Sequence, residues 1–227
     1  LQLLFTQDSD GDTALHIAAG NGHTHTVKFM LDNLIPEQKL QLLFTQNGKG
    51  NTALHDAVRL GHTGTVETLL DNLTPEQQLE LLFVQERFGH SALHLAAYSV
   101  DGFTETVRSL LSNLTPDQQL KLLITQDSDG DTALHVAAWR GHTEIVKTLL
   151  DNLTPEQQLK LLSLYNKKGN TASQRAAGTY GTSETITALG QYQKEADYRV
   201  NFRKFQNLAE TLTIQIISAS LHDYIGK

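Results

Sequence analysis

Thr132-Ala133-Leu134-His135 is the fourth copy of a motif that recurs along the chain and decides its fold. Closely similar copies stand at Thr13–His16, Thr52–His55 and Ser91–His94, and a changed copy follows at Thr171–Gln174. The steps between successive copies are 39, 39, 41 and 39 residues. A fixed period of this size indicates stacked supersecondary units, because each unit alone is too small to bury its own apolar face. The sequence therefore predicts an elongated body whose function lies on a surface and not in a catalytic pocket.

The residues around the fourth copy predict how one unit folds. Asp127–Asp131 has the Asp and Gly composition of a turn, and Thr132 can then cap a short helix through its side-chain oxygen. Gly141 marks the end of that helix, since a left-handed backbone costs little without a Cβ atom. Thr143 is expected to cap a second helix, whose apolar residues recur at helical spacing.

These residues resemble the ankyrin repeat. That family's pattern opens with Thr-Pro-Leu-His, continues with an Ala-Ala pair and Gly-His, and ends in a second helix of the Glu-Ile-Val type. Residues 132–146 reproduce it, with Ala133 in place of the family's proline, and the match recurs in five units over about residues 8–190. The resemblance implies an all-α fold in which antiparallel helix pairs stack into a curved solenoid, with projecting turns between repeats.

The chain has 10 histidines, and the resemblance assigns most of them to structure. Four of them stand at the last position of the opening motif: His16, His55, His94 and His135. In ankyrin repeats such a histidine hydrogen-bonds the neighbouring turn and ties one repeat to the next. Asp8–Asp12 and Asp127–Asp131 echo a calcium loop, but they lack the glycine at position six and the Glu at position twelve that an EF-hand requires. We therefore expect neither a metal nor a cofactor.

The period is longer than the usual ankyrin unit of about 33 residues, and the additional residues predict a third helix in each repeat. The segment Asn72–Leu79 recurs, identically or nearly so, at Asn33–Leu40, Asn113–Leu120 and Asn152–Leu159. Thr74 followed by Pro75 and Gln77 has the spacing of a capping box with Pro at the first helical position. Ile35 replaces this threonine in the first copy, so we expect a less well capped helix there.

The regular pattern fades towards the C-terminus. We place an ankyrin-type solenoid of about five repeats at residues 1–190 and a C-terminal helical segment at residues 191–227. Apolar residues from Tyr198 to Leu221 recur at i+3 and i+4 with almost no helix breaker between them, which predicts one long amphipathic helix or two. This segment is expected either to cap the open end of the stack or to reach another domain or a partner helix.

Composition excludes several classes of function. The net charge is −7, and residues 1–165 alone carry 10 Lys and Arg against 20 Asp and Glu, so repulsion from phosphate argues against a nucleic-acid partner. The chain has no cysteine and therefore no disulfide or thiolate nucleophile. No apolar run approaches the length of a membrane span. No phosphate-binding loop or catalytic triad is recognisable, so we expect no enzyme activity.

The resemblance also indicates where a partner binds. In ankyrin-type stacks the contact residues vary between repeats and stand at the turn tips, just before the opening Thr, and after the Ala-Ala pair. On this chain these positions give the following candidate partner-binding residues: Asp10, Asp12, Lys49, Asn51, Arg59, Leu60, Arg87, Phe88, His90, Tyr98, Asp129, Asp131, Trp139, Arg140 and Tyr180.

One cluster of these candidates lies in the third and fourth units. Arg87, Phe88, Tyr98, Trp139 and Arg140 are expected on the same concave side, and Trp, Tyr and Arg dominate interface hot spots. The third unit also carries two extra residues within 98–102, and insertions in repeat proteins often mark the contact surface. The alternative is that Trp139 and Tyr98 only pack between units.

These features predict a protein-binding module that acts as a monomer in the cytoplasm. The alternative is the targeting domain of a larger enzyme or of a secreted bacterial effector, because residues 1–7 match residues 40–46 and the chain thus begins inside a repeat. The lengthened repeats and the Gln- and Leu-rich third helix are similar to those of ankyrin proteins from intracellular bacteria. That resemblance implies a eukaryotic host protein as the partner and the host cell cytoplasm as the location.

Overall fold

The structure, a computed structural model, describes residues 2–99, 103–178 and 180–225. Over these ranges the regular elements are fourteen α-helices and a 3-10 helix, η1 (Gln2–Phe5), with no β-strand. The predicted all-α fold is therefore confirmed. None of the helices in the described ranges is long and apolar enough to cross a membrane.

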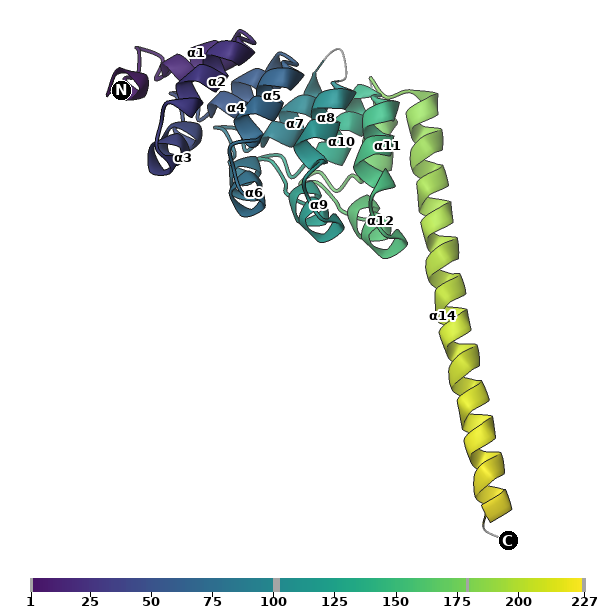
Figure 1. The fold of residues 1–227 in the computed structure, drawn as a ribbon. Helices are drawn as coiled ribbons and strands as arrows, with labels where there is room; N and C mark the ends of the chain where they lie inside the picture. Colours follow the sequence, from purple (N-terminus) through teal and green to yellow (C-terminus); the bar gives the residue numbers. More distant parts are fainter. Residues whose placement is uncertain (1, 100–102, 179, 226–227) are drawn as a thin grey trace.

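Each of the first four repeats contributes three helices, as the sequence predicted (Figure 1). The first helices are α1 (Ala14–Gly20), α4 (Ala53–Arg59), α7 (Ala92–Tyr98) and α10 (Ala133–Arg140). The second helices are α2 (Thr24–Asp32), α5 (Thr63–Leu70), α8 (Thr104–Leu111) and α11 (Thr143–Asp151). The third helices are α3 (Pro36–Phe44), α6 (Pro75–Phe83), α9 (Pro116–Leu123) and α12 (Pro155–Leu162). The prediction of a third helix in each repeat is wrong for the fifth. There α13 (Ala172–Ala176) is followed by α14 (Ser183–Ile225), one long helix that takes the place of a second and a third helix.

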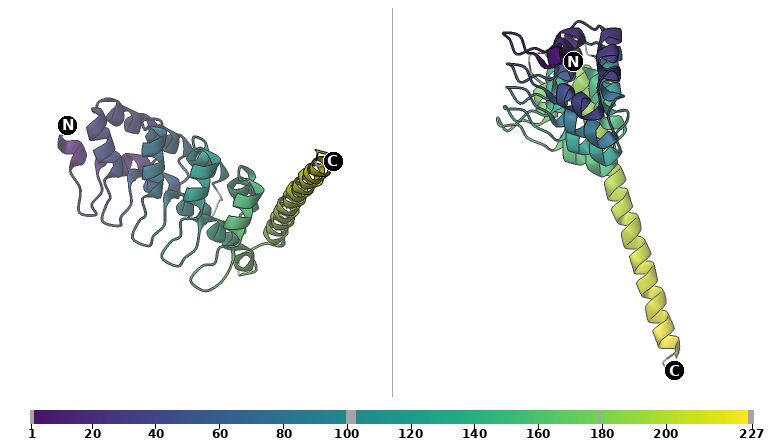
Figure 2. Two further views of the ribbon diagram at one scale, coloured as in Figure 1. Left: turned by 90° about the horizontal axis from the view of Figure 1, so that it is seen from below. Right: turned by 60° about the vertical axis from the view of Figure 1, so that its left-hand side comes forward.

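Corresponding helices pack against one another from repeat to repeat. The first helices α1, α4, α7, α10 and α13 form one layer, and the second helices α2, α5, α8 and α11 form another. The third helices extend from the stack on one side (Figure 1), and the turns before the first helices project as a row of parallel loops (Figure 2, left). This arrangement is the ankyrin-type solenoid that the resemblance implied.

The apolar core runs through the stack from repeat to repeat. Leu15, Leu54, Leu93 and Leu134 occupy the same motif position and are at most 1% exposed. The helices that carry these leucines pack against the first helices of the adjacent repeats, and burying one leucine contributes about 2 kcal/mol. The stability of the solenoid therefore depends on contacts between neighbouring repeats.

The third helices begin with the predicted capping box. In α6 the Gln77 N–H donates to the Thr74 hydroxyl at 3.3 Å, and the Thr74 N–H donates to the Gln77 side chain at 3.0 Å. The buried Gln78 side chain also donates to the carbonyl of Leu70 at 2.8 Å, which fastens the third helix to the end of the second. In α3 the Ile35 side chain makes no capping bond, as expected.

The second helices begin differently from the prediction. His142, and not Thr143, is the N-cap of α11, and it makes no side-chain capping bond. Thr143 is the first helical residue, and its hydroxyl lies 2.7 Å from that of Thr185 at the start of α14. A hydroxyl one position inside the helix faces the next repeat, so it joins repeats instead of capping its own helix.

The C-terminal segment forms one continuous helix, α14, which runs unbroken through residue 190. Its first turns cover the end of the stack, because Thr185, Leu189 and Ala196 are fully buried against α11, α12 and α13. The helix then leaves the stack (Figures 1 and 2). Its later apolar side chains are between 48% and 69% exposed: Tyr198, Phe202, Phe205, Leu208, Leu212 and Ile214. Of the two alternatives, capping therefore applies to the first turns of α14 and not to the side chains from Tyr198 to Ile214.

Candidate functional site

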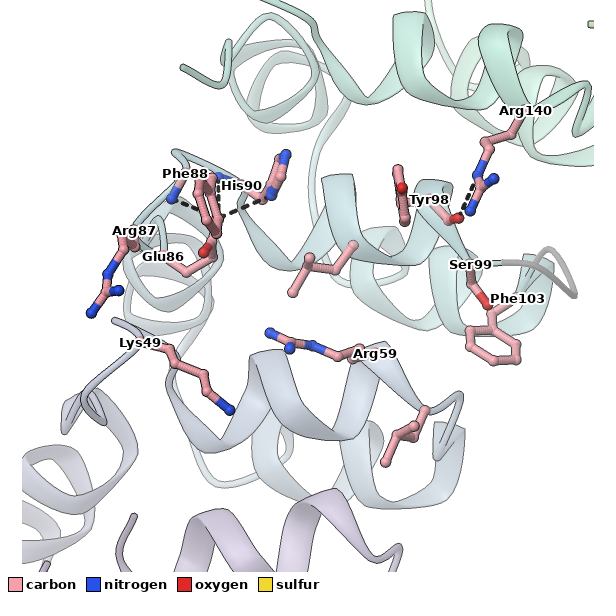
Figure 3. A pocket seen from close by; sticks show the side chains of 12 residues that line it. Lys49, Arg59, Glu86, Arg87, Phe88, His90, Tyr98, Ser99, Phe103 and Arg140 are labelled. Atoms are coloured by element: carbon pink, nitrogen blue, oxygen red, sulfur yellow. Dashed lines mark hydrogen bonds and ion pairs between the residues drawn. The ribbon is translucent and has the colours of Figure 1, made fainter. Parts of the chain in front are cut away.

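A groove of about 660 Å³ lies between the second and third repeats (Figure 3). Its walls are formed by the turns before α4 and α7, by these two helices, and by Arg140 at the end of α10. Eight of the candidate partner-binding residues line it: Lys49, Arg59, Leu60, Arg87, Phe88, His90, Tyr98 and Arg140. Four other residues complete the lining: Glu86, Leu95, Ser99 and Phe103.

The turn that carries Phe88 is held by hydrogen bonds within it and to the next turn. The Glu86 carboxylate accepts hydrogen bonds from the backbone N–H groups of Phe88 at 2.9 Å and His90 at 3.1 Å. Gly89 has a φ of 79°, and a Cβ atom there would lie 2.7 Å from the backbone nitrogen of Ser128 in the next turn. The Ser128 N–H donates to the Phe88 carbonyl at 3.0 Å. The fourth repeat therefore holds Phe88 at its exposed turn tip.

The groove presents apolar side chains to solvent. Leu60, Phe88 and Tyr98 are 58%, 64% and 48% exposed, and Leu95 and Phe103 are partly buried beside them. Single exposed apolar residues are ordinary on a protein surface, but a group of them in one concave place marks a binding surface. These five side chains supply an apolar contact area of that kind.

The same groove carries four basic side chains. Arg87 donates to the Gly48 carbonyl at 2.7 Å. Arg140 donates to the Tyr98 carbonyl at 2.9 Å, with its guanidinium carbon 4.1 Å from the centre of the Tyr98 ring. No hydrogen bond or ion pair within the described ranges engages the charged ends of Lys49 and Arg59. The rim of the groove is therefore electropositive, although the chain as a whole is acidic.

His90 is held between two carboxylates and is not a free group. Its Nδ1 lies 2.9 Å from Glu86 Oε1, and its Nε2 lies 3.5 Å from Asp127 Oδ2. The hydrogen bond to Asp127 raises the pKa of His90, and the negative charge of Glu86 raises it further, against the effect of burial. Burial alone would raise the pKa of Asp127, but the hydrogen bonds that Asp127 accepts from His90 and from backbone amides lower it. The ring therefore links the turns of the third and fourth repeats.

Trp139 lies beside the groove and not in its lining. Its ring centre is 6.0 Å from that of Tyr98 and 5.1 Å from that of Tyr180, the second contact being edge-to-face. The guanidinium carbon of Arg175 lies 5.3 Å from the centre of the Trp139 ring. Trp139 therefore packs between the last repeats, which is the alternative that the sequence left open for it. Tyr98 makes this packing contact and also lines the groove.

Two of the expected contact residues are buried and are therefore wrong as surface contacts. Asn51 is 1% exposed and Asp131 is 5% exposed. The Asn51 side chain donates to Asp56 at 2.9 Å. The Asp131 carboxylate accepts from Asn166 at 2.7 Å and from Arg175 at 2.8 Å. These polar groups connect each turn to its surroundings, so they belong to the framework of the stack.

The remaining candidates lie outside the groove. Asp10 and Asp129 are exposed on the first and fourth turns, and Tyr180 is exposed beside Trp139. Asp12 is partly buried and accepts a hydrogen bond from the Asn47 side chain at 2.6 Å. Of the insertion expected at 98–102, Tyr98 and Ser99 line the groove, and residues 100–102 lie outside the described residues.

All four motif histidines are hydrogen-bonded, and three of them tie their repeat to the next, as the resemblance implied. Each ring Nδ1 lies 2.8 Å from the Thr or Ser hydroxyl of its own motif. The Nε2 atoms of His16, His94 and His135 donate to carbonyl oxygens just before the next opening motif at 3.0 to 3.1 Å. His55 Nε2 donates instead to the carbonyl of Val84 at 3.1 Å, and Val84 ends α6 of the same repeat. A carbonyl oxygen can only accept, so Nε2 carries the proton and Nδ1 is the acceptor.

Asp12, His16 and Asp56 are close enough for one metal ion, since their ligand-type atoms lie within 4.8 Å of one another. Both nitrogens of His16 are already engaged, Nδ1 by the Thr13 hydroxyl and Nε2 by the Asn51 carbonyl. Burial raises the pKa of Asp56, which makes its charged form less favourable. This cluster is therefore explained by the contact between the first two repeats.

Sequence reasoning missed Leu95 and Phe103 in the groove lining. Leu95 stands at a position occupied by Ile17, Asp56 and Val136 in the other repeats, so the variability that identified the other candidates applies to it as well. Phe103 stands where the first, second and fourth repeats have His23, His62 and His142, and this change is also visible in the sequence. Their convergence with Leu60 and Phe88 required the geometry of the stack.

In a comparison with protein families, the model for ankyrin repeats in three copies matches residues 2–80 and 76–161. No curated protein matches the chain closely enough to count as a relative.

Proposed function

The chain belongs to the ankyrin-repeat family, and from this premise we propose that it binds a partner protein through the groove between its second and third repeats. Ankyrin repeats are generally protein–protein interaction modules and are typically not catalytic. The family thus indicates the class of function, and the groove indicates where on the surface the partner protein binds.

One observation carries this proposal. Eight of the fifteen residues at the variable positions of the repeats converge on a single groove, although Lys49 and Arg140 among them are 91 positions apart in the sequence. They include the Arg and Tyr types that dominate interface hot spots. The framework positions elsewhere in the stack carry buried leucines and hydrogen-bonded histidines. The groove is therefore the place where the chain differs most from the repeated framework.

We propose that the chain acts by binding alone. In the four motifs that contain histidine, the Thr or Ser hydroxyl lies against the His ring, whose other nitrogen bonds a backbone carbonyl, so these groups are not arranged for nucleophilic catalysis. We also propose that the module works as a monomer in the cytoplasm.

A second candidate is a targeting domain within a larger protein, such as a larger enzyme or a bacterial effector that acts on a eukaryotic host protein in the host cytoplasm. The exposed apolar side chains of α14, from Tyr198 to Ile214, favour this candidate because they are suited to contact with another body. The similarity of the lengthened repeats to bacterial ankyrin proteins makes a host-cell lysate the first source in which to seek the partner.

The test compares two double variants of the same kind. Leu60→Ala with Phe88→Ala removes two exposed apolar side chains from the groove, and Ile17→Ala with Phe29→Ala removes two exposed ones from the first repeat. A partner isolated with the wild-type chain is purified and titrated against both by calorimetry. Hot-spot truncation costs about 2 kcal/mol, so we expect about a thirtyfold weaker affinity for the groove variant alone. Equal affinity of the groove variant and the wild type, at equal melting temperature, would disprove the proposal.

A further inference from the structure

The charge of the groove differs from that of the rest of the molecule. The chain has 18 Lys and Arg against 25 Asp and Glu, yet Lys49, Arg59, Arg87 and Arg140 gather in one groove. Glu86 is the one carboxylate among the described lining residues. It is buried, and its oxygen accepts from two backbone amides and lies against His90, so it does not neutralise the rim.

Two of the four cations are available to a ligand. Arg87 and Arg140 already donate hydrogen bonds to the carbonyls of Gly48 and Tyr98. Lys49 and Arg59 have no such partner within the described part of the chain, and Figure 3 shows both side chains entering the groove from the second repeat. Positive charges held close together favour the binding of an anionic ligand. An Arg guanidinium can pair with a carboxylate through two parallel hydrogen bonds, in bidentate geometry.

The space between these cations is apolar. The apolar side chains of Leu60, Leu95 and Phe103 line the groove together with these cations. Phe88 lies on the side of the turns (Figure 3). A simple anion such as phosphate would leave these side chains uncovered, and a nucleic acid would be repelled by the acidic remainder of the chain. The complementary ligand therefore carries carboxylates and at least one apolar side chain.

We propose that the groove binds an acidic peptide segment of the partner, in which Asp or Glu residues flank an apolar anchor. The carboxylates pair with Lys49 and Arg59, and the anchor packs on Leu60, Leu95 and Phe103. This inference rests on the proposed protein-binding function and adds the chemistry of the partner to it.

The experiment uses phage-displayed random twelve-residue peptides selected on the full chain. Three variants of the chain are compared with the wild type. Lys49→Glu with Arg59→Glu reverses the charge of the groove, and Lys121→Glu with Lys160→Glu makes the same change in net charge on the exposed faces of α9 and α12. Leu60→Ala with Phe88→Ala tests the apolar contact. Selected peptides are then synthesised and titrated by fluorescence anisotropy.

We expect the wild type to enrich peptides with Asp or Glu beside Leu, Ile, Phe or Trp. Reversing the groove charge should weaken the affinity of these peptides at least about tenfold. The control reversal on α9 and α12 should change their affinity by less than about twofold. Their affinity should fall as NaCl rises from about 50 mM to about 500 mM, because salt screens exposed charges.

Two results would overturn the inference, and they are distinguishable. Enriched peptides without acidic residues that still depend on Leu60 and Phe88 would refute the acidic ligand and leave the protein-binding groove intact. A selection that yields no peptide sensitive to either groove variant would refute the ligand and the proposed function together.

Discussion

The imidazole Nε2 of His94 donates a hydrogen bond to the backbone carbonyl of Asp131 at 3.0 Å, so a buried side chain of the third repeat holds the turn of the fourth. The Nδ1 of the same ring accepts from the Ser91 N–H at 3.3 Å. The contact at Nδ1 requires a neutral ring, because a proton on Nδ1 would face the Ser91 N–H donor, whereas Nε2 can donate to Asp131 in either protonation state. Protonation of His94 therefore disrupts the cap of its own helix at a buried position.

Acidification should loosen the stack. Burial lowers the pKa of His55 and His94 from 6.5 to about 4. Between these values the unfolded chain binds the proton and the folded chain does not, so the stabilising contribution is complete above pH 6.5 and is lost as the pH falls towards 4. We expect the free energy of unfolding, measured by urea denaturation, to be lower at about pH 5 than at about pH 7.5. For each pH unit below 6.5, each of these histidines should raise the equilibrium constant of unfolding by up to about tenfold.

The control is His94→Gln. Gln174 occupies the motif position in the fifth repeat and still accepts the Thr171 N–H at 2.8 Å, so glutamine preserves the local cap. The variant should be less stable at neutral pH by about 1 to 3 kcal/mol, because the bond to Asp131 is lost. Its stability should also depend less on pH than that of the wild type. Parallel pH curves for the two proteins would contradict the assignment.

The contribution of His90 to stability should change with pH in the direction opposite to that of His55 and His94. Its pKa is raised by the hydrogen bond to Asp127 and the charge of Glu86, so its contribution is present below the unfolded value of 6.5 and is lost as the pH rises through its folded value. We expect His90→Gln to cost more stability at about pH 5.5 than at about pH 9, measured by urea denaturation at each pH. A loss that is equal at both would mean that the charge of His90 does not link the third and fourth turns.

The sequence predicted the repeated architecture because its signals are local. The cap at Thr132 and the box at Thr74 and Gln77 act within four residues, so the pattern of one repeat suffices to predict its helices. The burial of Asp131 was not predictable in this way. Its partner Arg175 lies 44 residues further along and meets it only after two repeats have stacked.

The candidate site was predictable in part for the same reason. Variability between repeats identified Arg59, Phe88 and Tyr98, which do line the groove. It could not show that Trp139 lies outside the groove lining, because the surroundings of Trp139 depend on Tyr180 and Arg175 in the fifth repeat. For α14, the i+3 and i+4 spacing from Tyr198 onward indicated an apolar face but not what lies against it.

The turn at Gly89 should be less tolerant of a side chain than the matching turn at Gly169. Both glycines have positive φ, 79° and 76°, so alanine strains each backbone by about 1 to 2 kcal/mol. At Gly89 the added Cβ also meets the Ser128 nitrogen at 2.7 Å, whereas at Gly169 nothing lies within 4 Å. We expect Gly89→Ala to lower the melting temperature clearly more than Gly169→Ala does. Equal effects would show that adjacent turns do not depend on this close contact.

Removal of the distal part of α14 should leave the stack intact. A chain that ends at Lys204 loses side chains that are exposed where the structure describes them, so the free energy of unfolding should change by less than about 0.5 kcal/mol. Leu189→Ala is the contrasting variant, because Leu189 is fully buried against the end of the stack and its truncation should cost about 2 to 5 kcal/mol. Urea denaturation of both proteins measures the difference. If the truncation costs as much as Leu189→Ala, the distal helix supports the fold, and its apolar face is not free to contact another body.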